Sequence, residues 1–207
     1  MSSSPTYLDP VVIPLIRGDT VLDVGCGYGR WCHLIQSNFW EARLSKPPLI
    51  DGFDAFEANV EYCRKQNCYR RVWQQSMPSA LSERWDTVLA CEVIEHIDQG
   101  NVEDAISALE KVANLRIILS TPNWPYFRPG GDTIVGYNEH EAHVSHLPRS
   151  YFRQRGYRLL GAGFGNRSNL PSRVIKKAFL NWAPMLESLP RAFPSWGESL
   201  VAYKDFN

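Results

Sequence analysis

The segment VLDVGCGYGRW, residues 21–31, constrains the fold of this chain more than any other feature. An apolar run leads to Asp23, and glycines follow at three alternate positions, Gly25, Gly27 and Gly29, before a helical pattern begins. Glycine tolerates positive φ and lets the backbone approach a ligand closely. In an open α/β sheet the ligand crevice lies at the carboxyl ends of the strands, near such a turn. The segment therefore predicts a ligand-binding turn between a strand and a helix.

Short apolar runs alternate with helical patterns along the rest of the chain, which is typical of a parallel sheet covered by helices. The predicted strands are Thr20–Val24, Leu49–Phe53, Arg71–Gln74, Asp86–Cys91, Arg116–Ser120, Tyr157–Phe164 and Glu198–Lys204. The predicted helices are Arg30–Asn38, Glu57–Gln66 and Val102–Ala113. A chain of 207 residues has the length of one domain. We therefore expect one α/β domain over residues 1–207, doubly wound, with a mostly parallel seven-stranded sheet, helices on both faces and residues 1–5 flexible.

Two segments depart from this alternation. Residues 123–147 carry two prolines, a Gly-Gly pair, scattered aromatic residues and clustered histidines. A connection of this length without clear secondary structure is more often functional than a linker, so we expect a substrate-side loop. Residues 171–193 combine an apolar stripe with basic residues, and we expect a helical insertion there, before the last strand, ended by Pro184.

Composition limits the class of protein. Lys and Arg number 22, as do Asp and Glu, so the formal net charge is zero and a uniformly basic nucleic-acid protein is excluded. Hydrophobic residues make up 44% and charged residues 21%, which excludes a wholly disordered chain. No run approaches the roughly 18 to 20 apolar residues of a membrane-spanning helix. The five cysteines form no CxxC pair, so we expect reduced thiols in a cytoplasmic protein without a signal peptide.

The glycine-rich segment resembles the first motif of the class I S-adenosylmethionine-dependent methyltransferases, and further similar motifs follow in order. These are LIDGFDAF, DTVLACEVIEHI, ILSTPN, HVSHLPRSYF and ESLVAYKD. The resemblance implies a Rossmann-like fold and S-adenosyl-L-methionine as cofactor, with S-adenosyl-L-homocysteine as product. At a strand end, Asp54 is expected to hold the ribose, as the acidic residue does in dinucleotide folds; a helix N-cap is the alternative.

The family usually has an acidic adenine contact after the third strand, where this chain reads Gln75, Ser76 and Met77. A glutamine amide oxygen can accept from the adenine amine, but without charge. Together, the motifs predict the following cofactor-binding residues: Asp23, Gly25, Cys26, Gly27, Gly29, Asp54, Ala55, Gln75, Ser76, Met77, Cys91 and Glu92.

The later motifs are close to those of the quinone-biosynthesis methyltransferases and their small-molecule relatives, which implies a small-molecule acceptor methylated at oxygen. The enzyme must then hold the acceptor in line with the carbon–sulfur bond, and a base assists a hydroxyl acceptor. Histidine titrates in the range suited to such a base. Of four candidates, His143 and His96 are the predicted catalytic residues, while His140 and His146 also fall near the expected mouth. For each, a structural hydrogen bond is the alternative.

Two other functions remain open. The sequence ExxEH, with Glu92, Glu95 and His96, resembles the small-RNA 3′-terminal 2′-O-methyltransferases, where such a cluster and a later histidine bind a divalent ion such as Mg²⁺ or Mn²⁺. We expect no metal, because Glu-His also recurs in metal-free small-molecule enzymes. The missing acidic adenine contact also permits a catalytically degenerate, cofactor-binding regulatory subunit.

A basic stretch bears on partners. Residues 142–186 contain eight Lys and Arg but no Asp or Glu. The simplest interpretation is a solvated face. The functional alternatives are a contact with a phosphate-bearing acceptor or a membrane surface through residues 149–182, with RNA a less favoured partner.

Overall fold

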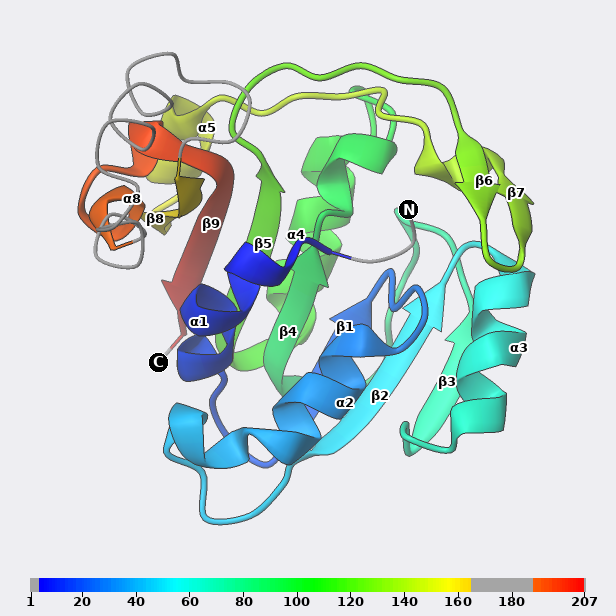
Figure 1. Ribbon diagram of the computed structural model, residues 1–207. Helices are drawn as coiled ribbons and strands as arrows, with labels where there is room; N and C mark the ends of the chain where they lie inside the picture. Colours follow the sequence, from blue (N-terminus) through cyan, green and yellow to red (C-terminus); the bar gives the residue numbers. More distant parts are fainter. Residues whose placement is uncertain (1–3, 165–187, 207) are drawn as a thin grey trace, which may run out of the picture.

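The computed structural model describes residues 4–164 and 188–206, and its main feature is a seven-stranded sheet (Figure 1). The strands of this sheet are β1 (Thr20–Val24), β2 (Leu49–Asp54), β3 (Arg71–Gln74), β4 (Trp85–Cys91), β5 (Ala113–Pro122), β8 (Arg158–Phe164) and β9 (Gly197–Asp205). Their order is β3-β2-β1-β4-β5-β9-β8. All seven strands correspond to predicted ones.

The first five strands of that order are parallel, and β9 pairs antiparallel with both β5 and β8. The helices are α1 (Asp9–Val12), α2 (Arg30–Ser37), α3 (Glu57–Gln66), α4 (Val102–Val112), α5 (Arg149–Gln154) and α8 (Leu189–Ala192). Short 3-10 turns are η1 (Thr6–Leu8), η2 (Ile13–Leu15), η3 (Phe39–Ala42), η4 (Ile94–His96), η5 (Glu139–Glu141) and η7 (Pro194–Trp196). The expected Rossmann-like α/β architecture is confirmed.

Helices cover both faces of the sheet, and each face has its own hydrophobic core. Along β1, Val21 packs with the residues of α1 and α2, whereas Leu22 packs with those of α4. Neighbouring side chains of a strand point to opposite faces, so the central strands need apolar residues at successive positions. Strand β4, with Val88, Leu89 and Ala90 all fully buried, has this pattern. The two cores fix the strands rigidly, and the carboxyl ends of the parallel strands all meet at one edge.

The segment expected to be an unstructured substrate-side loop, residues 123–147, has more structure than predicted. It contains a short hairpin of β6 (Gly131–Thr133) and β7 (Gly136–Asn138) and crosses above the carboxyl edge of the sheet (Figure 1). The strands are only three residues long and lack a clear alternation of apolar residues, which is why the sequence did not reveal them. Most of the insertion predicted at residues 171–193 lies outside the described residues.

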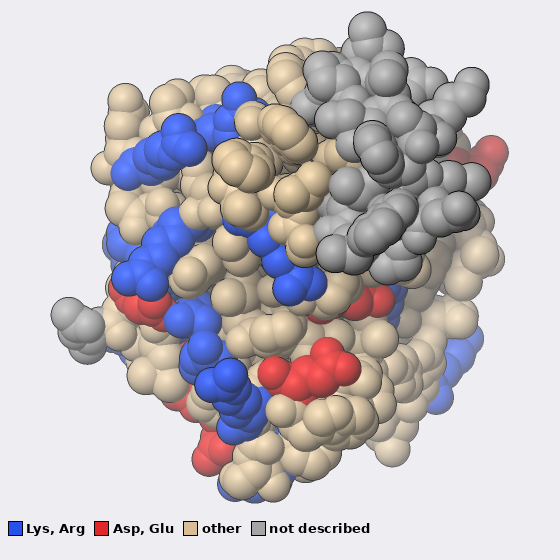
Figure 2. Space-filling model, turned by 60° about the vertical axis from the view of Figure 1, so that its left-hand side comes forward, with Lys and Arg blue, Asp and Glu red and all other residues tan. Residues whose placement is uncertain are grey.

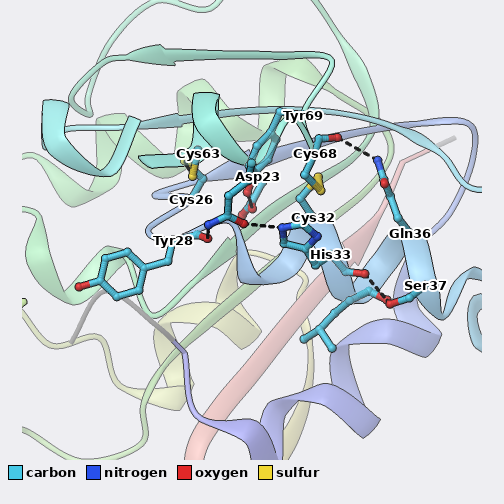
Figure 3. Close-up of a disulfide and its surroundings, with 12 residues drawn as sticks. Asp23, Cys26, Tyr28, Cys32, His33, Gln36, Ser37, Cys63, Cys68 and Tyr69 are labelled. Atoms are coloured by element: carbon cyan, nitrogen blue, oxygen red, sulfur yellow. Dashed lines mark hydrogen bonds between the residues drawn. A yellow bond between two sulfur atoms is a disulfide. The ribbon is translucent and has the colours of Figure 1, made fainter. Parts of the chain in front are cut away.

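Two further expectations concern the start of the chain and its cysteines. Residues 1–5 were expected to be flexible; within them, Ser4 donates a hydrogen bond to the carbonyl of Cys91. The expectation of five reduced thiols is wrong, because Cys32 and Cys68 form a disulfide (Figure 3). Their Cα atoms are 6.2 Å apart, within the range of disulfides, although 36 positions separate them in sequence. Only the packing of α2 against the segment before β3 brings them together.

Within residues 4–164 and 188–206, none of the helices has the length and apolar character needed to cross a membrane.

Candidate active site

A cavity of about 750 Å³ opens at the carboxyl edge of the parallel strands. Its walls come from the turn after β1, the ends of β2 and β4, and the crossing segment 123–147. This is where a doubly wound sheet places its ligand. Its volume is ordinary for a small-molecule site.

The turn after β1 approaches the cavity with an unusual backbone. Gly25, Gly27 and Gly29 all have positive φ, of 65°, 54° and 79°. A Cβ on Gly25 would lie 2.6 Å from a methyl group of Val93, so no larger residue fits there. Gly29 begins α2 as its left-handed N-cap. The three glycines are therefore required by the positive φ values of this turn, as predicted from the sequence.

Asp54, at the end of β2, is held rigidly beside this turn. One carboxylate oxygen accepts from the backbone N–H of Gly27 at 2.8 Å, and the other accepts from the N–H of Phe56 at 2.9 Å and from the side chain of Asn59 at 3.1 Å. Burial raises the pKa of Asp54, and these donors counteract part of that shift. The N-cap alternative is wrong, because Phe56 is the N-cap of α3 and no side chain caps that helix; the residue Asp54 lines the cavity instead.

Gln75 is oriented by Trp73. Its amide oxygen accepts from the indole N–H of Trp73 at 2.8 Å, which uses one of its two lone pairs. Its amide nitrogen is buried and has no partner among the described residues. Gln75 lines the cavity together with Ala55, Ser76 and Met77. The side chain therefore offers a donor, which suits a ring nitrogen of a purine.

Glu92 follows β4 with a φ of 57°, which is strained for a residue with a side chain. Its carboxylate accepts from the hydroxyl of Ser120 at 2.9 Å, and its N–H donates to the carbonyl of Ser120 at 3.0 Å. Burial raises the pKa of Glu92 to about 7. Backbone strain persists only where surrounding contacts enforce it and is frequent at functional sites. These contacts hold Glu92 and the neighbouring Cys91 at the cavity wall.

A second polar group lies opposite, made of Glu95, His96 and His143. One potential ligand atom from each lies within 4.8 Å of the others. The two imidazoles meet edge to face with their centroids 4.7 Å apart. Burial lowers the pKa of His96 and lowers that of His143 to about 4, while it raises the pKa of Glu95 well above its ordinary value. Both imidazoles are therefore neutral at pH 7.

Several polar atoms of this group have no partner in the part of the chain that the structure describes. They are both carboxylate oxygens of Glu95 and Nδ1 of His143. By contrast, Nδ1 of His96 lies 3.0 Å from the carbonyl of Ala142. A carbonyl can only accept, so the His96 proton sits on Nδ1 and Nε2 carries a lone pair. Buried polar atoms without partners are rare, and at this position they indicate a site for a ligand.

Backbone contacts bring His143 to η4 across a long sequence separation. The N–H groups of Val144 and Ser145 both donate to the carbonyl of Glu95, at 2.8 and 3.1 Å. His143 also exchanges backbone hydrogen bonds with Arg128 on the other arm of the crossing segment. The segment is therefore bonded to the turn after β4, and the two histidines meet as a consequence.

A family model described as a methyltransferase domain matches residues 8–165. The chain belongs to this methyltransferase family. The class I S-adenosylmethionine-dependent resemblance expected from the sequence motifs is thereby confirmed.

Curated relatives agree with this assignment. The chain is 28% identical over 134 residues to a ubiquinone biosynthesis O-methyltransferase of Bartonella quintana, covering 62% of this chain and 51% of that protein. It is 31% identical over 116 residues to the protein of the same name from Pseudomonas paraeruginosa, covering 52% and 46%. The chain thus spans about half the length of the curated relatives it matches.

Solved structures show the same fold. An S-adenosylmethionine-dependent methyltransferase from Archaeoglobus fulgidus superposes with a TM-score of 0.59 at 14% identity, covering 96% of this chain and 91% of that one. The magnesium protoporphyrin IX methyltransferase of Synechocystis, solved with bound S-adenosylmethionine, has a TM-score of 0.53 at 17% identity, covering 97% and 74%. At such identities the likeness concerns the fold alone.

Most predicted site residues of the methyltransferase reach the cavity, and a few do not. Asp23 is fully buried beneath the glycine turn and, like Gly29, is absent from the cavity wall. His140 lines the cavity, whereas His146 lies outside it, in a shallow depression beside α4 and α5. Residues that the sequence did not single out also line it: Ser4, Tyr7, Arg30, Asn59, Asn101, Arg128, Asn138 and Ser199. They belong to no recurring pattern, so only the fold reveals them.

Proposed function

We propose that this protein transfers the methyl group of S-adenosylmethionine to an oxygen of a small-molecule acceptor. The observation that carries the proposal is the pairing of two sites in one cavity. The glycine turn and Asp54 form one wall, and the group of Glu95, His96 and His143 forms another. The sulfonium methyl is already electrophilic, so the protein's task is to position and deprotonate the acceptor.

The cofactor contacts follow from the donors and acceptors on the cavity wall. Each oxygen of a carboxylate accepts two hydrogen bonds, so Asp54 retains one lone pair for a ribose hydroxyl, on the oxygen that accepts only from Gly27. The amide nitrogen of Gln75 donates to the adenine ring, with Met77 and Ala55 against its face. Cys91 and Glu92, which line the same cavity, would contact the methionine portion.

Proton removal falls to His96. Its Nε2 lone pair is the free acceptor of a ring fixed through Nδ1 by Ala142. Its lowered pKa keeps the ring neutral and able to accept a proton at pH 7. His143 packs against it and holds the ring in place. We assign the acceptor wall to Trp124 and Tyr126, which line the same cavity and are 38% and 54% exposed.

The test measures release of S-adenosylhomocysteine with a panel of mono- and dihydroxylated aromatic acceptors, with and without apolar tails. We expect turnover with at least one phenolic acceptor and its loss in His96→Asn, which keeps a donor at the position of Nδ1 but lacks the base. His146→Asn, outside the cavity, serves as the matched control and should retain activity. Cofactor binding without turnover of any oxygen acceptor would instead support the regulatory-subunit alternative.

One observation favours a metal-assisted form of the same reaction. Glu95 and His143 direct three buried atoms without partners into a space shared with His96. A buried polar group without a hydrogen-bond partner is costly, and one oxygen and two nitrogen ligands suit a divalent transition ion. The residues present therefore fit a cation, which when bound would lower the pKa of an acceptor hydroxyl. Our sequence analysis expected no metal.

Chelation distinguishes the two forms. If the reaction is metal-free, dialysis against EDTA leaves turnover unchanged; if it is metal-assisted, turnover falls at least about tenfold and Mn²⁺ or Mg²⁺ restores it. In the metal-assisted form Glu95→Gln abolishes the restoration, and the apo protein binds Mn²⁺ in a calorimetric titration without cofactor or acceptor.

The contacts with a phosphate group, a membrane surface or RNA that the basic stretch suggested remain proposals. Figure 2 shows Lys and Arg gathered in a band across one face. Of the basic residues counted in residues 142–186, Arg155 pairs with Glu103 and Glu110, whereas Arg153 and Arg158 are exposed. These two leave a phosphate or membrane-surface contact as a prediction, and RNA stays the less favoured acceptor. The cytoplasmic location also stays a prediction, although the disulfide removes one of its reasons.

A further inference from the structure

Beneath the glycine turn, outside the cavity, Tyr69 and Asp23 form a buried hydrogen bond of 2.6 Å (Figure 3). Asp23 is the residue next to last in β1 and thus leads directly into the turn. Tyr69 reaches it from the segment between α3 and β3, across β2. Its ring passes over Gly52, where a Cβ would lie only 2.8 Å from the ring. A glycine in the middle of β2 thus makes room for this contact.

The pair depends on the tyrosine. Asp23 is fully buried, and its second oxygen has no partner among the described residues. Burial raises the pKa of Asp23 to about 7, against the opposing effect of the Tyr69 hydroxyl. No cation faces Asp23 among the printed contacts, so the hydroxyl is the group that stabilises its charge. Displacement of Tyr69 would leave a buried carboxylate without any hydrogen bond, at the base of the cofactor turn.

The residue before Tyr69 is covalently tied to the helix that follows the turn. Cys68 forms its disulfide with Cys32, in the first turn of α2. Gln36, one helical turn further, donates to the carbonyl of Cys68 at 3.0 Å. Both ends of the glycine turn are thus connected to one short segment: the strand before it through Tyr69, and the helix after it through Cys68.

We propose that the Cys32–Cys68 disulfide holds Tyr69 in place as a positioning residue of the cofactor turn, so that the oxidised protein binds S-adenosylmethionine more tightly than the reduced one. The inference rests on the cofactor site proposed above. Cys32 is fully buried while Cys68 is partly exposed, so a small thiol attacks the sulfur of Cys68. This forms a mixed disulfide and releases the thiol of Cys32. A second thiol molecule then frees Cys68, and the two small thiols leave as their disulfide.

The other thiols near the turn are unsuited to this exchange. Cys26 and Cys63 are buried with their sulfur atoms 4.0 Å apart, and Cys63 donates to the carbonyl of Gly27 at 3.2 Å. Burial and the neighbouring thiol raise the pKa of Cys26 well above its ordinary value, which keeps it protonated and unreactive. Oxidation state therefore changes at the Cys32–Cys68 bond and not within the turn itself.

Calorimetric titration with S-adenosylhomocysteine tests the proposal on the full chain before and after dithiothreitol. Thiol counting on denatured samples verifies each state, because the oxidised form has three free cysteines and the reduced form five. We expect the dissociation constant to rise about fivefold or more on reduction, as in ordinary coupling between sites. The Cys32→Ser/Cys68→Ser double variant should show the weaker affinity and no response to dithiothreitol.

Tyr69→Phe separates positioning from general stability. It should weaken binding in the oxidised protein and have a smaller effect in the reduced protein, because Tyr69 is no longer held there. Tyr203→Phe, on β9 away from the turn, is the matched control and should change neither affinity. Equal affinities of the oxidised and reduced forms, within about twofold, overturn the proposal, as does a disulfide that native protein does not release to dithiothreitol. Absence of binding in both forms would overturn the cofactor site as well.

Discussion

Replacing Asp54 by alanine removes the side chain that we propose to link the glycine turn to the ribose. In the structure its two oxygens already accept from Gly27, Phe56 and Asn59, so the carboxylate is oriented before the cofactor arrives. A hydrogen bond to a charged group contributes about 1.5–3 kcal/mol. Losing the ribose hydroxyls' acceptor should therefore cost about 2 kcal/mol in binding, or about thirtyfold in the dissociation constant of S-adenosylhomocysteine.

Calorimetry measures this loss, and thermal unfolding checks that the variant is folded. The alanine also leaves the N–H of Gly27 without its acceptor, so some loss of stability is expected in addition. Asp54→Asn keeps the shape of the side chain and one acceptor oxygen. Its dissociation constant should therefore lie between those of the unmodified protein and Asp54→Ala. Asp104→Ala, on the exposed side of α4, is the control. An affinity of Asp54→Ala within about twofold of the unmodified protein would refute the assignment, since it would mean that no hydrogen bond to a charged group was lost.

Three further substitutions test the geometry. Gly25→Ala places a Cβ 2.6 Å from Val93 at a φ of 65°; the left-handed backbone alone costs about 1–2 kcal/mol, so both the melting temperature and cofactor affinity should fall, whereas Gly100→Ala, with open space around it, should change neither. Gln75→Glu replaces the free amide donor by an acceptor and should weaken binding about tenfold if that donor contacts adenine; unchanged or tighter binding would contradict the orientation described here. His143→Asn tests pH dependence: the folded pKa of about 4 lies below the unfolded value near 6.5, so the unfolded chain binds more protons between these values and stability decreases as pH falls through that window. The slope attributable to His143 is up to about 1.4 kcal/mol per pH unit, and chemical denaturation at pH 7, 6 and 5 should show a smaller decrease in the variant.

The fold was predictable because the periodicity in this chain is local. Strand β1 and helix α3 have the predicted bounds, since each is delimited by its own signals: the glycines after Val24 and the change of pattern after Phe56. Strand β5 extends further than its apolar run suggested, from Ala113 to Pro122, because pairing with β4 and β9 recruits flanking residues. Propensity does not encode such tertiary pairing.

Some features of the candidate site were likewise predictable from local sequence, whereas others depend on tertiary packing. The positions of Gly25 and Asp54 at the cavity were predictable because they depend on backbone conformation and strand ends, which sequence motifs record. The orientation of Gln75 was not, because it follows from the indole N–H of Trp73, a contact that only the packed structure shows. The Cys32–Cys68 disulfide was not predicted, because cysteine spacing does not determine pairing. Here the pairing follows from how α2 packs beside the segment before β3.

The histidine pair shows which part of the molecule decides the chemistry. His96 belongs to the turn after β4, a fixed part of the sheet edge, but His143 belongs to the crossing segment and reaches it only through the hydrogen bonds of Val144 and Ser145 to the carbonyl of Glu95. These bonds use backbone groups alone and place no demand on the side chain of residue 143. The identity of residue 143 can therefore vary without disturbing the sheet, whereas the cofactor turn cannot. The cofactor turn and the proposed base His96 thus belong to the sheet edge, whereas His143 and the aromatic residues that we propose for the acceptor wall belong to residues 123–147.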